Sequence, residues 1–126
     1  MAFEEYKPVS GRYTPVISIG RGGFGISVGF ERKYTDAIRD ESTTGVKLYF
    51  DTSRSAGAIG FKFVSAQEEG TLKIKRLSKG GFFLPARAFL VKHDIDNRFE
   101  TRYTPKIETT PQGELFVIEL KEKTGS

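Results

Sequence analysis

Arg21-Gly22-Gly23-Phe24-Gly25-Ile26-Ser27 is one of two stretches that decide the fold; the other is Lys79-Gly80-Gly81-Phe82-Phe83-Leu84-Pro85, 58 residues further along the chain. Each contains a basic residue, two glycines, a phenylalanine, a variable residue, a branched aliphatic residue and a residue suited to starting a helix. Paired glycines allow positive φ or a close approach of backbones. The pattern predicts an internal repeat, with structural turns at Gly22, Gly23, Gly80 and Gly81.

The residues around the first turn predict strands, a short helix and a hairpin. Residues 16–19 and 24–26 have strand character, and Phe30, Tyr34 and Ile38 then recur every four residues after the potential cap Ser27. This spacing predicts a helix over 28–39. Alternating apolar residues then predict the two strands of a hairpin at 46–50 and 59–63.

The same order follows the second turn. Pro85 is suited to the first position of a helix, which we expect over 86–92. The strands expected in this copy are 72–75, 102–107 and 115–120. The order strand, turn, strand, helix, hairpin therefore occurs twice.

One such repeat is too small to bury both faces of its few strands alone, so we expect the two copies to interlock. The predicted fold is all-β or β-rich α+β, a pseudo-twofold barrel of two intertwined repeats. We divide the chain into a lead-in at 1–15, a first repeat at 16–63, a second repeat at 64–120 that shares its core, and a tail at 121–126. The lead-in is expected to contact the core through Phe3, Tyr6 and Tyr13.

Composition argues against several classes of site. The chain has 126 residues, no cysteine and one histidine, His93, which lies between Lys92 and Asp94 and is expected in a solvated loop or helix end. We therefore predict no disulfide, metal, cofactor, catalytic residue or small-molecule substrate, and no enzyme activity. No apolar run reaches the roughly 20 residues that span a bilayer, and the acidic start lacks a basic signal region. We expect a cytoplasmic protein with no membrane partner.

The distribution of charge points to a polyanion. Although the net charge is only +4, no acidic residue occurs between Glu5 and Glu31 or between Glu69 and Asp94, and each glycine turn lies in one of these windows. A pseudo-twofold fold would bring the two basic turns to equivalent places, where they could straddle the phosphates of a duplex. We predict binding of nucleic acid, expected to be duplex DNA, through Arg21, Arg32, Lys33, Lys75, Arg76, Lys79 and Arg87.

Other interpretations stay open. The basic residues could be ordinary solvated strand faces, and exposed strand edges could instead assemble a homo-oligomer without nucleic acid. Phe83 and Tyr49 could stack on unpaired bases, whereas alternation places Phe24 and Phe82 in the core. Gly20-Arg21-Gly22-Gly23-Phe24-Gly25 matches the letters of a nucleotide-binding loop, but the lysine strand and acidic residues of such folds are absent.

The repeat resembles the AbrB-like transcription regulators, whose swapped-hairpin barrels contain a strand, a glycine turn, a β segment ending in Ile/Leu-Pro, a helix and a hairpin. The two glycine stretches carry the resemblance, followed by Phe30-Glu31-Arg32 and 46–51 in the first copy and by Ala88-Phe89-Leu90 in the second. The resemblance covers about residues 16–120, in a tandem arrangement similar to that of MraZ-type proteins. It implies duplex DNA binding through Arg21, Arg32, Lys79 and Arg87. The chain departs from the pattern at Ser27, where proline is expected, and lacks a strongly basic strand before Arg21.

Overall fold

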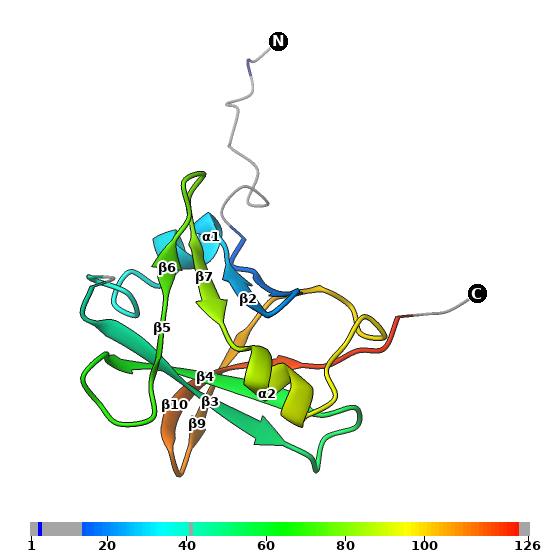
Figure 1. The fold of residues 1–126 in the computed structure, drawn as a ribbon. Coiled ribbons are helices and arrows are strands. Elements are labelled where there is room, and N and C mark those ends of the chain that lie inside the picture. The colour runs from blue at the N-terminus through cyan, green and yellow to red at the C-terminus, as the bar shows by residue number, and fades with distance from the viewer. Residues whose placement is uncertain (1–2, 4–13, 41, 124–126) are drawn as a thin grey trace.

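The computed structural model describes residues 3, 14–40 and 42–123 of the chain. These residues form short strands and two helices, drawn in Figure 1. In chain order the elements are β1 (Ile17–Gly20), β2 (Gly23–Ile26), α1 (Val28–Lys33), β3 (Thr44–Asp51), β4 (Ala58–Ser65), β5 (Leu72–Lys73), β6 (Lys75–Arg76), β7 (Phe82–Pro85), α2 (Arg87–Lys92), β8 (Arg102–Tyr103), β9 (Lys106–Thr110) and β10 (Gly113–Glu119).

The strands form two five-stranded antiparallel sheets. Sheet A has the order β6-β7-β2-β1-β8, and sheet B has the order β5-β3-β4-β10-β9. The predicted β-rich class is therefore confirmed. A closed barrel is not shown: the described strands form two sheets, whose edge strands are β6 and β8 in sheet A and β5 and β9 in sheet B.

Two pairings join the first half of the chain to the second with a matching register. In sheet A, β2 pairs with β7 through Phe24–Leu84 and Ile26–Phe82, and a shift of 58 residues exchanges these two pairs. In sheet B, Phe61–Phe116 and Ile59–Ile118 are exchanged in the same way by a shift of 57 residues. An approximate twofold relation between the halves produces this pattern, so the repeat seen in the sequence also governs how the strands pair.

Two segments expected to be single strands instead switch between the sheets. The strand predicted at 72–75 is divided at the buried Ile74, so that β5 pairs with β3 in sheet B and β6 pairs with β7 in sheet A. The strand predicted at 102–107 is divided at Thr104 and Pro105, and proline lacks the N–H that a continuous ladder needs. Strands that change sheet in this way make the corners of the fold.

The two helices follow β2 and β7. Ser27 caps α1 as predicted, because its Oγ accepts a hydrogen bond of 3.0 Å from the backbone N–H of Phe30. The helix ends at Lys33, well short of the predicted residue 39, and Tyr34 already has non-helical angles. Pro85 is the last residue of β7 rather than the first of α2, whose cap position is Ala86.

Aromatic side chains fill the space between the sheets. Phe24 of sheet A and Phe61 of sheet B are both fully buried, and their rings meet edge to face with centroids 5.0 Å apart. Phe30 continues the cluster toward Phe63 and Phe116. Because these residues come from both halves of the chain, one apolar core serves both repeats.

Some expectations fall outside the described residues. The contacts predicted for Tyr6 and Tyr13 belong to the lead-in, of which only Phe3, Thr14 and Pro15 are described. The contact predicted for Phe3 is wrong, because its side chain is 94% exposed and so does not pack against the core. None of the helices described here has the length and apolar character needed to cross a bilayer.

Candidate nucleic-acid interface

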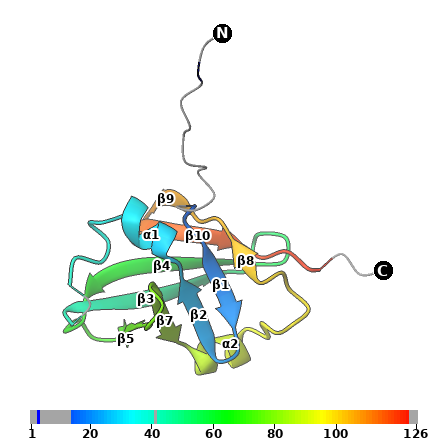
Figure 2. The ribbon, with the colours of Figure 1, turned by 90° about the horizontal axis from the view of Figure 1, so that it is seen from above.

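The two glycine turns lie at opposite ends of the central strand pair of sheet A. Since β2 and β7 are antiparallel, the start of β2 at Gly23 faces the end of β7 at Pro85. The first turn therefore lies beside α2, as Figure 2 shows, and Gly22 accepts a hydrogen bond of 2.9 Å from the N–H of Ala86. The second turn lies beside α1 (Figure 1). The antiparallel pairing therefore places the two turns at opposite ends of β2 and β7 and not side by side. Duplex binding through both turns stays a prediction.

The α1 end of the molecule gathers five of the seven predicted binding residues. The turn at 77–81 contacts the start of α1, where a Cβ on Gly80 would lie 2.6 Å from Cγ2 of Val28. Strand β6 is tied to α1 by an ion pair of 3.0 Å between Arg76 and Glu31. We call this surface the α1-end basic cluster; its side chains are all exposed and belong to Arg32, Lys33, Lys75, Arg76 and Lys79.

Within this cluster the side chains have different surroundings. The Arg76 guanidinium lies 4.5 Å from the ring centroid of Phe82, in addition to its ion pair with Glu31. The Lys33 ammonium lies 5.6 Å from the ring centroid of Tyr34. Lys75 and Lys79 form no ion pair with any described residue. Those two lysines are therefore available to an external anion.

Arg21 and Arg87 lie together at the other end, beside α2. Both line a cavity of about 840 Å³ whose apolar wall includes Leu90 and whose rim also carries Asp94 and Asp96. Asp96 accepts a hydrogen bond of 2.9 Å from the backbone N–H of Arg98 and one of 2.8 Å from its side chain, and these two bonds, the backbone one first, lower the pKa of the Asp96 carboxyl. This end of the molecule has mixed charge, in contrast to the α1-end basic cluster.

The predicted structural glycines have different roles. Gly22, Gly80 and Gly81 have positive φ angles of 83°, 101° and 77°, a region that favours glycine. Gly23 has no positive φ, but a Cβ there would collide with the carbonyl oxygen of Leu84. Its role is the close approach of β2 and β7.

The aromatic candidates divide as the alternation predicted. Phe24 and Phe82 are fully buried in the core, while Phe83 and Tyr49 are half-buried. Tyr103 is 8% exposed, and its hydroxyl accepts a hydrogen bond of 3.2 Å from the backbone N–H of Lys121. Of these five candidates only Phe83 and Tyr49 are not buried, and Tyr49 packs against the small cluster of Ala58, Leu115 and Val117 on sheet B.

The lone histidine is held by aromatic rings. The imidazole of His93 stacks on Phe50 with centroids 4.2 Å apart and contacts Phe89 at 4.6 Å. Burial, with a smaller effect of Lys92, lowers the pKa of His93 below its ordinary value. Within residues 14–40 and 42–123, no group of three His, Asp or Glu side chains has an arrangement that could hold a metal ion.

Comparison with known proteins identifies no relative. No family model, curated protein or solved structure matches the chain. The resemblance to AbrB-like regulators stays a prediction that rests on the residues quoted above.

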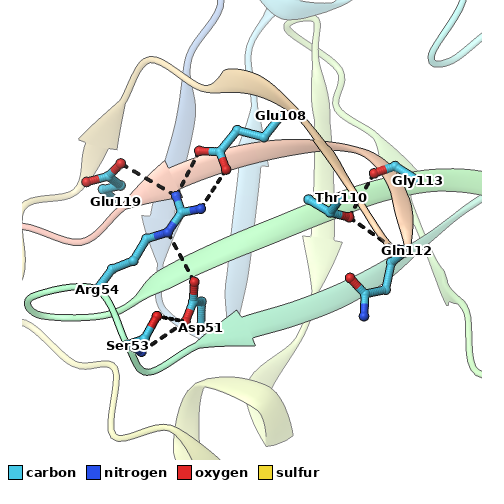
Figure 3. A network of polar contacts seen from close by, with 8 residues as sticks. All are labelled: Asp51, Ser53, Arg54, Glu108, Thr110, Gln112, Gly113 and Glu119. Atoms are coloured by element: carbon cyan, nitrogen blue, oxygen red, sulfur yellow. Dashed lines mark hydrogen bonds and ion pairs between the residues drawn. The ribbon is translucent and has the colours of Figure 1, made fainter.

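A network around Arg54 was not anticipated from the sequence. Arg54, in the β3–β4 loop, donates two hydrogen bonds of 2.8 and 2.6 Å to the carboxylate of Glu108 and one of 3.1 Å to Asp51 (Figure 3). Glu119 lies 3.6 Å from the same guanidinium. Because Glu108 lies in β9, the network fastens an edge strand of sheet B to the loop. Arg54 and Glu108 are far apart in sequence, so no local motif predicts this network.

We expect Arg54→Met to lower the urea midpoint of unfolding at pH 7. Hydrogen bonds from Arg54 are the main cause that lowers the pKa of Glu108 below its ordinary value of 4.5. A lowered carboxyl pKa stabilises the folded protein above that ordinary value, and the contribution disappears as the pH falls through the lowered pKa. The difference between Arg54→Met and the unchanged protein should therefore shrink in acid.

Arg39→Met provides the matched control for this network. Arg39 pairs at 2.9 Å with Asp36, but the two side chains are 78% and 87% exposed, and such pairs contribute little to stability. The urea midpoint of Arg39→Met should equal that of the unchanged protein both at pH 7 and in acid. An Arg54→Met protein whose deficit is the same at pH 7 and in acid would contradict the electrostatic explanation.

Proposed function

We propose that the chain binds nucleic acid through the α1-end basic cluster and the adjoining face of sheet A. The observation that supports this most is the convergence of five basic side chains from α1, β6 and the 77–81 turn. Glu31 is the acidic residue of α1, and Arg76 already pairs with it. A surface of this kind is suited to phosphates, whose charge dominates affinity for nucleic acids.

The contacts available here favour recognition of the backbone over recognition of base sequence. Reading the major groove requires an element that enters it, commonly a helix or a two-stranded ribbon. Helix α1 has only six residues, and its last turn supplies Arg32 and Lys33. Lysine and arginine at such positions contact phosphates and fix orientation without reading sequence. A role in transcription and a cytoplasmic location remain predictions from the sequence.

Self-association without nucleic acid is the alternative, and it has less support. The exposed large apolar side chains among the described residues are Phe3, Leu77, Val91 and Ile107, which belong to separate segments. Isolated exposed apolar residues are normal on a protein surface. Ile107 lies on the edge strand β9, where a second chain could add a strand. Sedimentation or size exclusion at two protein concentrations would detect such an assembly.

The function is tested by titrating labelled oligonucleotides and following fluorescence anisotropy at several salt concentrations. We expect affinity to fall steeply with salt for the unchanged protein. The double variant Lys75→Ala/Lys79→Ala should reduce the slope of log K against log salt by about 1.4 to 1.8, since each phosphate contact contributes about 0.7 to 0.9.

A matched double variant controls for net charge. Lys62→Ala/Lys106→Ala also removes two positive charges, but these residues lie on sheet B. Its affinity and slope should stay close to those of the unchanged protein. Equal losses in the two double variants would show a general charge effect and contradict the α1-end surface, and no binding of any oligonucleotide would refute the function itself.

A further inference from the structure

Five residues form a row across the outer face of sheet A, the side turned away from the core. The strand registers place Lys75 of β6 next to Phe83, Phe83 next to Gly25, Gly25 next to Ser18, and Ser18 next to Arg102 of β8. Residues paired in this way point to the same side of a sheet. The row therefore begins and ends with a cation at the two edges of the sheet and has an aromatic ring between them.

The middle of this outer face is almost free of side chains. On β1 and β2 the residues that point outward are Ser18, Gly20, Gly23 and Gly25. The ring of Phe83 reaches over them, because a Cβ on Gly23 would lie 2.7 Å from Cζ of Phe83. A Cβ on Gly25 would lie 2.6 Å from Oγ of Ser18. The glycines thus let the Phe83 ring and the Ser18 hydroxyl lie low against the sheet, so that no large side chain of β1 or β2 stands in front of the ring. We call this part of the outer face the floor.

Phe83 differs from the other phenylalanines between residues 14 and 123. Nine of them belong to the apolar core or pack directly against it, and Phe83 is the exception. The Phe83 ring also contacts no other described aromatic ring. Its neighbour Phe82, in contrast, is fully buried in the core. Phe83 is thus a half-buried phenylalanine outside the core, whose uncovered part is available for a ligand.

The charges around this floor favour an anion. None of the residues that point outward from sheet A is acidic. Lys75 and Arg102 at its edges form no ion pair with a described residue. The turns with Lys79 and Arg21 lie at the two ends of the β2–β7 pair, so each end of the floor also has a basic residue, although Asp94 and Asp96 lie near Arg21. The two turns thus lie on either side of a nucleic-acid strand that crosses the sheet along the row from Lys75 to Arg102.

We propose that the outer face of sheet A binds single-stranded nucleic acid, with an unpaired base stacked on Phe83 and the flanking phosphates bound by Lys75 and Arg102. This inference rests on the proposed function and adds the class of nucleic acid. In a duplex the bases are already stacked and paired, so a ring that lies on a flat sheet cannot reach them. Single strands expose base faces, and aromatic side chains on sheets are common stacking partners for them.

The test compares an oligothymidylate with a duplex of the same length, using Phe83→Leu and Tyr49→Leu. Leucine keeps an apolar side chain but removes the aromatic face. We expect the unchanged protein to bind the single strand more tightly, and Phe83→Leu to weaken that binding about tenfold, within the range measured for loss of one stacked base. The slope of log K against log salt should not change, because no phosphate contact is removed.

Tyr49→Leu is the matched control, since Tyr49 is also half-buried but belongs to sheet B. It should bind as the unchanged protein does. Arg102→Ala should reduce the salt slope, in contrast to Phe83→Leu. Equal or tighter binding of the duplex, with no effect of Phe83→Leu, would overturn this inference and leave nucleic-acid binding intact. Failure to bind either oligonucleotide would overturn both this inference and the proposed function. A dimer that depends on Phe83 and binds neither oligonucleotide would do the same.

Discussion

Phe61→Ala is expected to remove about 3 to 5 kcal/mol from the free energy of unfolding, the usual cost of deleting a buried phenylalanine ring. Phe61 is fully buried in β4, and its ring contacts that of Phe24 in β2 at 5.0 Å. The pair joins sheet B to sheet A, so the substitution opens a cavity between the two sheets. Since a domain has only about 5 to 15 kcal/mol of stability, the variant should unfold at a much lower urea concentration.

Phe3→Ala is the control for this prediction. It deletes the same ring from a side chain that is 94% exposed, and surface substitutions of this kind usually change stability by about 0.5 kcal/mol or less. The double variant Phe24→Ala/Phe61→Ala measures the contact itself, and a coupling of about 0.5 to 1.5 kcal/mol is expected for an aromatic pair. If Phe61→Ala unfolded at the same urea concentration as Phe3→Ala, the result would contradict the burial of Phe61 between the two sheets.

Local sequence patterns predicted most elements because they depend on local physics. Alternation placed strands near 46–50 and 59–63, and the structure has β3 and β4 there, although both are longer. Ser27 was identified as a cap because its side chain can satisfy a free backbone N–H. The end of α1 was missed, since the spacing of Tyr34 and Ile38 suits both a helix and the turn that replaces it. Periodicity alone does not show where a helix stops.

The candidate site depended on information that a repeat does not carry. Two copies of a motif predict that two turns are equivalent, but only the antiparallel pairing of β2 with β7 shows that they lie at opposite ends of sheet A. Arg102 was missed because its neighbour Ser18 is distant in sequence and is brought beside it only by strand register. Phe83 was anticipated as an accessible aromatic because it alternates with Phe82 and Leu84, which face the core.

The adjacent glycines of the first motif, Gly22 and Gly23, should respond differently to the same substitution. Gly22 has a φ of 83°, but a Cβ there would have no neighbour within 4 Å, so Gly22→Ala should cost only the strain of a left-handed residue, about 1 to 2 kcal/mol. At Gly23 a Cβ would collide with the backbone of Leu84, which has no side-chain rotamer to relieve the contact. We expect Gly23→Ala to cost about 3 kcal/mol, the upper end of the usual range for overpacking.

Urea unfolding of the two variants measures this difference, and nucleic-acid binding adds a second readout. Gly23 faces Pro85 in the pairing that joins the halves, so strand separation there should lower the cooperativity or the midpoint of the whole transition. The same Cβ would lie 2.7 Å from the Phe83 ring, so Gly23→Ala should also weaken single-strand binding under conditions where the variant remains folded. Gly22→Ala should leave the ring in place. A larger loss of stability in Gly22→Ala than in Gly23→Ala would mean that the turn, rather than the close contact of β2 with β7, is what requires glycine.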